Sequence, residues 1–381
     1  MLLSSIGTLV VSSGAAEAHV KWFAPYIVGA APQSIGQTLT NSWFWTGIVL
    51  VLLFLLTTIV IERRPVGQAA LAGLDRFTGP VARRADDFMR ATTAAFFVAV
   101  FAVGGVYLTP DLRTPSELIS WAQLLIAAGI FSRRTMPFSA AGVIALWLIA
   151  LRDYELFHLL DYLALGIGVA GYLLLASIDN PRWHEKRFTV LFWGVAIALM
   201  WSSLEKFAYP DWFYPLVEER PFLTFGLPRD AFIPMAGVAE FTLGFGLIWS
   251  PLVRRLSAIS LLVIFMTAVY PFGRIDFVGH AMIMAALVLI AADPVRKGYA
   301  MEAIAPAAAH PKRRLAAVPT GLAMALVVIA SSYWGLHATF FGADGNVTPD
   351  ELATHSFSPE HPHGPQREEG LSAPSALSDT D

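Results

Sequence analysis

The side chains best suited to chemistry are ionisable groups within apolar stretches: Glu205, Lys206, Glu240, Asp276 and His280. A charged group at bilayer depth costs roughly 3 kcal/mol on insertion scales, so such groups usually face inward, pair and serve a function. Carboxylates, an amine and an imidazole can exchange protons and hydrogen-bond the head group of a quinone. We therefore predict that these side chains line a proton or quinone pocket near the outer face of a membrane protein.

Lys206 and Glu240 are the central pair of this predicted pocket. Lys206 ends one apolar run on the predicted outer side, and Glu240 lies within the next run, about one helical turn deeper. A lysine side chain can cover that separation. Two hypotheses remain open: the pair relays protons or binds a quinone head group, or it is a structural ion pair with Lys206 reaching towards water.

Two further pairs place a histidine and an aspartate on one helix face. Asp276 and His280 are four residues apart, and His158 and Asp161 are three residues apart in the first half of the chain. A carboxylate that orients an imidazole is the usual environment of a metal-binding histidine, but it also satisfies an ordinary buried histidine. Both interpretations stay open for each pair.

Histidines on the predicted outer side are candidates for metal binding, and the ones we select are His19, His158, His280 and His337. Cleavage of a signal peptide after Ala18 would leave the new amino group and the His19 imidazole as two adjacent nitrogen ligands. Nitrogen ligands without a thiolate favour copper or nickel. The alternative is that these histidines bind no metal.

The elements that position these groups belong to a membrane protein. Of the 381 residues, 56% are hydrophobic and only 14% are charged, whereas soluble domains carry about 25% charged residues. A lipid bilayer is therefore the expected partner. The net charge of −3 argues against a nucleic-acid partner. The absence of cysteine excludes disulfides, thiol redox chemistry and thiolate metal sites.

Apolar runs predict an all-α, polytopic transmembrane helix bundle with about ten spanning helices, because backbone groups in hydrocarbon must be satisfied internally. The predicted helices are Ser42–Ile61, Ala91–Leu108, Ser116–Phe131, Phe138–Leu151, Leu156–Ser177, Phe188–Phe207, Ala231–Ser250, Leu256–Pro271, Ile275–Ala292 and Ala316–Phe341. The aromatic loop Ala208–Asp230 is expected to lie on the outer leaflet or to cap a vestibule above Lys206.

The chain divides into six predicted segments. They are a signal peptide (1–18), an outer segment with the first span and an inner loop (19–90), a four-helix unit (91–177), a second four-helix unit (178–292), an inner loop with the last span (293–341) and a disordered outer tail containing histidines (342–381).

Basic residues predict the orientation. If the N-terminus lies outside, most of the 26 Lys and Arg residues fall in the inner loops. This distribution indicates a multi-pass protein of the bacterial inner membrane with both mature termini on the periplasmic side.

An internal repeat is visible at low resolution. The segment SWAQLLIAAGIF aligns with GVAEFTLGFGLI, which places Gln123 opposite Glu240 and Gly129 opposite Gly246. The pair His158 and Asp161 repeats the aspartate–histidine pair near the end of the second unit. We interpret the two four-helix units as tandem copies; chance similarity between apolar helices is the alternative.

Four features of residues 188–292 carry a resemblance to a known family: the Glu205-Lys206-Phe207 helix end, the segment AGVAEFTLGFGLI, the pair Arg254-Arg255 and the helix start IDFVGH. In these features the second unit resembles the DoxX family of four-helix bacterial membrane proteins. The resemblance implies a four-helix bundle associated with membrane oxidoreductases and quinone-linked metabolism. The first unit departs from the pattern, because Gln123 stands where the glutamate is expected.

Three functional hypotheses follow. The first is an accessory or quinone- and proton-interacting subunit of a periplasm-facing redox system, with a membrane or periplasmic redox protein as partner. The second is a copper-binding or metal-handling membrane protein, and the third is a structural scaffold for a partner. The sequence contains no complete nucleophile or cofactor motif, so it leaves open whether the protein is an enzyme.

Overall fold

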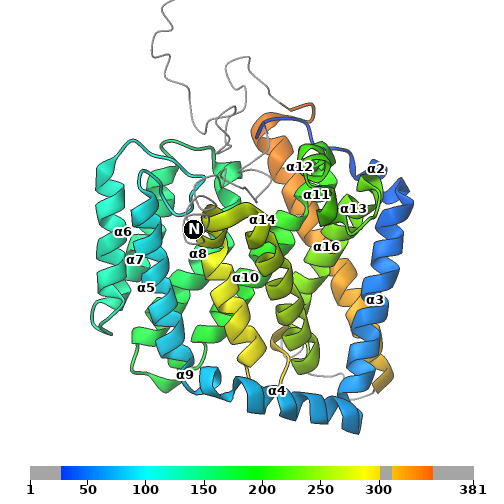
Figure 1. The fold of residues 1–381 in the computed structure, drawn as a ribbon, viewed down its shortest axis with the longest axis horizontal. Helices are drawn as coiled ribbons and strands as arrows, with labels where there is room; N and C mark the ends of the chain where they lie inside the picture. Colours follow the sequence, from blue (N-terminus) through cyan, green and yellow to red (C-terminus); the bar gives the residue numbers. More distant parts are fainter. Residues whose placement is uncertain (1–26, 301–310, 346–381) are drawn as a thin grey trace, which may run out of the picture.

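The structure, a computed structural model, describes residues 27–300 and 311–345. The predicted signal peptide, His19 and the predicted tail beyond residue 345 lie outside the described residues. Within the described ranges every regular element is a helix, and an isolated β-bridge joins Val106 to Arg113 in a loop (Figure 1). The prediction of an all-α fold is confirmed.

The helices of the first half are α2 (Ile35–Thr40), α3 (Ser42–Glu62), α4 (Pro65–Arg83), α5 (Ala85–Val103), α6 (Glu117–Gly129), α7 (Met136–Ala150) and α8 (Leu156–Ser177). Those of the second half are α9 (Pro181–His184), α10 (Arg187–Ser203), α11 (Glu205–Ala208), η1 (Pro210–Phe213), α12 (Tyr214–Glu219), η2 (Pro221–Thr224), α13 (Arg229–Gly246), α14 (Pro251–Ala292) and α16 (Pro311–Phe341).

Contacts between loops define two opposite ends of the bundle (Figure 1). At one end, which carries α4, Asp86 at the start of α5 pairs with Arg187 at the start of α10. At the other end, which carries α12, the Gln33 N–H donates to the Ala208 carbonyl, and the Trp334 indole donates to the Gln33 carbonyl. We call these the α4 end and the α12 end. The long helices run between them.

Six helices of the described chain are long and apolar enough to cross a membrane: Ser42–Glu62, Leu156–Ser177, Pro181–Ala208, Pro251–Tyr270, Gly273–Ala292 and Leu315–Phe341. The protein is therefore a multi-pass membrane protein, but the predicted count of about ten spans is not confirmed. Helices α6 and α7 have 13 and 15 residues, fewer than the roughly 20 needed to span the hydrocarbon core. Helices α5 and α13 carry charged residues in their first turns.

Helix α14 contains the two predicted helices on either side of residue 273 as one kinked element. Gly273 has φ 77° and ψ −159°, a non-helical conformation that glycine adopts without a steric penalty. The predicted break between Pro271 and Ile275 is thus confirmed as a kink. It changes the direction of the chain without a loop.

The two predicted four-helix units meet where α8 packs against α10. A Cβ atom on Gly194 would lie 2.7 Å from both the Cα atom of Gly168 and the Ala164 carbonyl oxygen, so the backbones touch. Helix α14 packs against α5, which gives a second contact between the units. At both places the last helix of one unit packs against the first helix of the other unit. This arrangement is expected of two tandem copies, and the division into copies remains a prediction.

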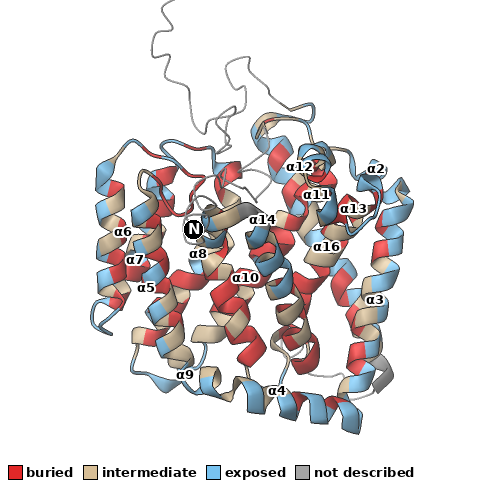
Figure 2. Cartoon of the chain, viewed as in Figure 1, coloured by how far each residue is buried: buried red, intermediate tan, exposed pale blue. Residues whose placement is uncertain are grey.

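Helix α4 is an element that the sequence prediction missed, because residues 62–90 were assigned to an inner loop. It lies across the α4 end of the bundle, roughly perpendicular to the long helices (Figure 1). Buried side chains concentrate in the centre of the bundle, whereas α3 and α4 expose much of their surface (Figure 2). On α3, Trp45, Val49 and Leu53 are exposed apolar residues, as expected of a helix that faces lipid.

Candidate functional site

The predicted pairing of Lys206 and Glu240 is confirmed. Lys206 Nζ on α11 lies 2.6 Å from Glu240 Oε2 on α13, and the side chains are 16% and 28% exposed. The ammonium group also lies 4.8 Å from the centre of the Phe213 ring. A carboxylate and an aromatic face therefore stabilise the same cation. Glu205, the preceding residue, is buried.

Gly237 allows α11 to approach α13 closely enough for this pair. A Cβ atom at Gly237 would lie 2.8 Å from a ring carbon of Phe207 and 3.0 Å from the Cβ atom of Lys206. Gly237 precedes Glu240 by three residues, so both lie on the same face of α13. The absence of a side chain at Gly237 thus positions Lys206 beside Glu240.

A cavity of about 230 Å³ opens beside Lys206 at the α12 end. Its lining comes from three stretches of the chain: Gln33, Thr38, Asn41, Lys206, Phe207, Pro210, Tyr214, Asp230, Ile233 and Pro234. The loop Ala208–Asp230 contributes several of these residues, so the predicted vestibule above Lys206 is present. Pro234 has no N–H to donate to the Asp230 carbonyl one turn earlier, which leaves that carbonyl without its helical donor.

The predicted pairing of Asp276 with His280 is also confirmed. His280 Nδ1 lies 2.7 Å from Asp276 Oδ1, and Asp276 is completely buried. The Phe265 ring packs against the imidazole with a centroid separation of 4.8 Å. Of the five side chains predicted to line one pocket, Lys206 belongs to the described lining of the cavity at the α12 end. The other four, Glu205, Glu240, Asp276 and His280, do not.

Gln123, the repeat counterpart of Glu240, forms hydrogen bonds to the backbone and no ion pair in the described residues. Its amide Nε2 donates to the carbonyl oxygens of Val106 at 2.6 Å and Tyr107 at 2.7 Å. An ionised glutamate has no N–H to donate. Gln123 therefore anchors the loop between α5 and α6 where Glu240 forms an ion pair.

His158 and Asp161 of α8 have partners on α10 and in the loop before α6. Asp161 Oδ1 accepts a hydrogen bond of 2.8 Å from the Trp201 indole. His158 Nε2 lies 4.0 Å from Asp111 Oδ2, and both side chains are completely buried. Tyr162 also donates to the Asp111 carboxylate. The pair thus links the first unit to α10 and to the loop before α6.

Asp111 is a buried carboxylate that sequence reasoning missed. It lies in the loop between α5 and α6, and Thr109 also donates a hydrogen bond to it. A single aspartate in a short polar loop looks like an ordinary solvated residue. Only the fold, which buries that loop at the α12 end, distinguishes it.

The metal hypothesis receives no geometric support from the described residues. Within 27–300 and 311–345, no group of three or more His, Cys, Asp or Glu side chains is placed to hold a metal ion. His337 is buried between the rings of Phe157 and Phe341. His19 lies outside the described residues.

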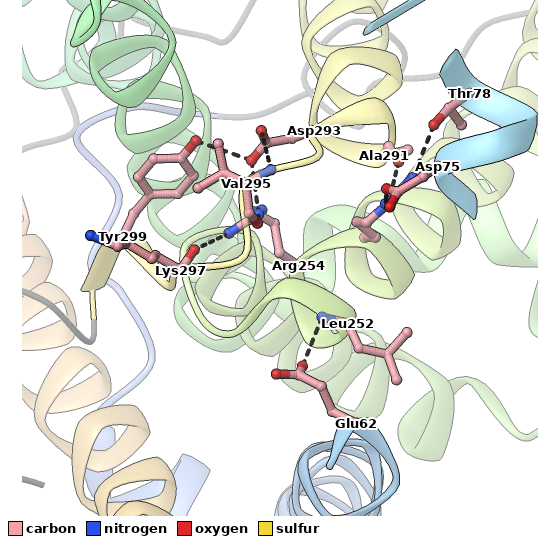
Figure 3. A network of polar contacts seen from close by, with 11 residues as sticks. Glu62, Asp75, Thr78, Leu252, Arg254, Ala291, Asp293, Val295, Lys297 and Tyr299 are labelled. Carbon is pink, nitrogen blue, oxygen red and sulfur yellow. Dashed lines mark hydrogen bonds and ion pairs between the residues drawn. The ribbon is translucent and has the colours of Figure 1, made fainter. Parts of the chain in front are cut away.

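A second polar network lies at the α4 end, around Arg254 (Figure 3). Arg254 is fully buried and pairs with Asp293 at 2.8 Å. It also donates to the carbonyl oxygens of Val295 and Lys297. Burial raises the pKa of the Asp293 carboxyl, and Tyr299 donates to the same carboxylate at 3.0 Å. The network fixes the chain segment that leaves α14.

The neighbouring Arg255 connects α14 to α4. It donates to Asp75 at 2.5 Å, to Thr78 at 2.9 Å and to the Ala291 carbonyl at 2.7 Å (Figure 3). Glu62 accepts from the Leu252 N–H at 2.7 Å. The basic pair noted in the sequence is therefore structural, and its acidic partners could not be recognised among other loop carboxylates.

An apolar groove of about 520 Å³ lies between α8 and α10. Leu163, Ile167 and Trp193 are among its lining residues, and Leu336 of α16 contributes at one side. Its lining is apolar apart from Thr189 and two indoles, and the Trp201 indole already donates to Asp161. The groove therefore suits a hydrocarbon chain and offers little to a polar ligand.

No protein-family model, curated protein or solved structure matches the chain. Function must therefore be argued from the sites themselves.

Proposed function

We propose that the protein is a DoxX-like accessory subunit of a periplasm-facing redox system in the bacterial inner membrane. In this proposal the cavity beside Lys206 binds the head group of a quinone. The observation that carries the proposal is the position of Lys206, whose ammonium group pairs with Glu240 and which belongs to the lining of the cavity.

The chemistry of the pair fits a quinone head group. A quinone carbonyl accepts a hydrogen bond from an ammonium group, and a quinol hydroxyl donates one to a carboxylate. Reduction of the quinone takes two electrons and two protons. The partner redox protein would supply the electrons. Lys206, with Glu240 as its own proton partner, would donate one proton to the ring oxygen nearest it, and solvent would supply the second proton to the other oxygen.

The size and lining of the cavity support the head group as the ligand. Its volume of about 230 Å³ is smaller than that of pockets for drug-sized ligands, which hold roughly 300–1,000 Å³. Tyr214 and Phe207 offer aromatic surfaces, and Asn41 and Gln33 offer amide groups. This combination suits one polar ring with small substituents.

The test is the binding of a short-chain benzoquinone analogue to the purified full-length protein in detergent, measured by calorimetric titration. We expect Lys206→Met to raise the Kd about tenfold or more, because a hydrogen bond to a charged group contributes roughly 1.5–3 kcal/mol. The matched control is Lys186→Met, since Lys186 contacts the Trp183 ring at the α4 end. Equal affinities in both variants, or no binding to the wild type, would refute the proposal.

A further inference from the structure

The outward face of α4 carries a continuous apolar stripe. Val66, Ala70, Gly73, Phe77 and Pro80 are all exposed and follow each other at intervals of three or four residues, which places them on one side of the helix. Val66 is 71% exposed and Phe77 is 86% exposed. A helix in contact with water alone would gain nothing from an exposed phenylalanine at this position.

The orientation of this stripe is fixed by the opposite face of α4. Leu71 is buried, and Asp75 and Thr78 both accept hydrogen bonds from Arg255 on α14. Leu71, Asp75 and Thr78 are spaced by four and three residues, so they form a single docked face. The helix cannot turn its apolar stripe towards the bundle without breaking these contacts.

Exposed charge along this segment has one sign. Between residues 63 and 84 the exposed charged side chains are Arg63, Arg64, Arg76, Arg83 and Arg84. Asp75, the acidic residue of the same segment, pairs with Arg255 and Arg296. The outward surface of α4 is therefore apolar along its centre and positively charged beside it and at both helix ends.

The position of α4 defines the surroundings of this face. Two residues, Arg63 and Arg64, separate the end of the candidate span Ser42–Glu62 from the start of α4 at Pro65. The helix lies across the ends of the spanning helices and is exposed along much of its length (Figures 1 and 2). It therefore lies at the depth where hydrocarbon meets lipid head groups.

We propose that α4 is an interfacial helix that seats the α4 end of the protein on anionic phospholipids. Phe77 and Val66 insert between acyl chains, and the flanking arginines contact the phosphate groups. Apolar insertion and attraction to anionic lipid are the two contributions that bind such helices to a leaflet. This inference is independent of the quinone proposal.

The absence of cysteine allows a direct test with nitroxide labels on the full-length protein in vesicles of phosphatidylcholine and phosphatidylglycerol. We expect a label at Phe77→Cys to be accessible to oxygen and protected from an aqueous nickel complex. A label at Ala72→Cys, exposed on the arginine side of the helix, should show the reverse. Equal accessibility to the nickel complex at both positions would show that the Phe77 side of α4 faces water. Protection of position 77 from both reagents would show that another protein covers it. Either result overturns the proposal.

A second measurement tests the charge. A fluorophore at Phe77→Cys should be quenched more by nitroxide-labelled phosphatidylglycerol than by nitroxide-labelled phosphatidylcholine. Each arginine near an anionic surface contributes about a fivefold preference, so adding Arg76→Gln and Arg83→Gln should lower this preference by about tenfold or more. The control pair Arg133→Gln and Arg134→Gln, exposed in the loop after α6, should leave it unchanged. Equal quenching by the two lipids in the unmodified background would refute the anionic-lipid site.

Discussion

Lys206 and Glu240 illustrate which residues a sequence alone can identify. A charge within an apolar run is conspicuous because its transfer into hydrocarbon is unfavourable, and the same physics requires a partner nearby. The pair could therefore be predicted, as could the pair of Asp276 with His280. Asp111 and Asp293 lie in segments that connect helices, and Asp75 lies in α4, which the sequence did not reveal; a carboxylate in such segments is ordinary until the fold provides its partners.

We expect Lys206→Met to destabilise the protein by about 2 kcal/mol because Glu240 is left without its partner. This is less than the roughly 3–5 kcal/mol typical of fully buried pairs, since both side chains retain some solvent contact. Chemical unfolding in detergent micelles provides the measurement.

The double change Lys206→Met with Glu240→Gln serves as the control. Removing both charges eliminates the unpaired carboxylate, so the double variant should be more stable than Lys206→Met alone. Additive losses would mean that the two side chains stabilise the fold independently.

At the scale of helices, close packing at glycine positions explains much of the arrangement. Near Glu240, Gly244 lies against Leu199 and Met200 of α10. The sequence does not reveal the α4 helix as readily as it reveals the spanning helices. The helix is amphipathic, but its apolar residues are interrupted by Asp75, Arg76 and Pro80, so the apolar runs that predict spanning helices do not reveal it.

The contact between α11 and α13 leads to a prediction about Gly237. We expect Gly237→Ala to cost about 1–3 kcal/mol, because the added methyl group meets Phe207, and Phe207 is itself buried against Phe44. The matched control is Gly166→Ala on α8, where an added Cβ meets no atom within 4 Å. Thermal unfolding of both variants in detergent measures the difference. Equal midpoints would show that α11 can shift without loss.

The ion pair between Asp86 of α5 and Arg187 of α10 should make the stability of the fold depend on pH. Burial disfavours the charge of Asp86, but hydrogen bonds from Arg187 at 2.7 Å and its positive charge outweigh this, so the pKa of Asp86 lies below its usual range. A lowered pKa means that the contribution to stability is present above about pH 4 and is lost as the pH falls through the native pKa. Asp86→Asn should therefore cost up to about 1 kcal/mol at pH 7, since Asp86 is 37% exposed, and less at pH 3.

Unfolding of the wild type and of Asp86→Asn, followed from pH 7 to pH 3, measures whether the difference in their stability shrinks as the pH falls. The control is Asp179→Asn, because Asp179 is 97% exposed and lies 4.0 Å from the exposed Arg133. That variant should follow the wild type throughout. A constant gap between wild type and Asp86→Asn would show that ionisation of Asp86 does not contribute.

At the scale of the whole molecule, the arrangement of basic residues combines two roles. Arg254, Arg255 and Arg187 are engaged in ion pairs that hold helix ends together. The exposed arginines of α4 are free of such contacts to the bundle's acidic groups among the described residues, and they supply charge to the surface. Both sets lie at the α4 end, so the charge asymmetry that predicts orientation also has structural consequences.

Orientation itself is a prediction that single cysteines can test, because the natural chain has none. If the α4 end faces the cytoplasm, Ser132→Cys and Ala72→Cys should resist an impermeant thiol reagent in intact cells, and Glu219→Cys near α12 should react. All three positions are exposed, so protection reports the side of the membrane. All three variants should react after permeabilisation. Labelling of positions 132 and 72 with protection of 219 would invert the orientation and place the Lys206 cavity on the cytoplasmic side, where a periplasmic redox partner could not reach it.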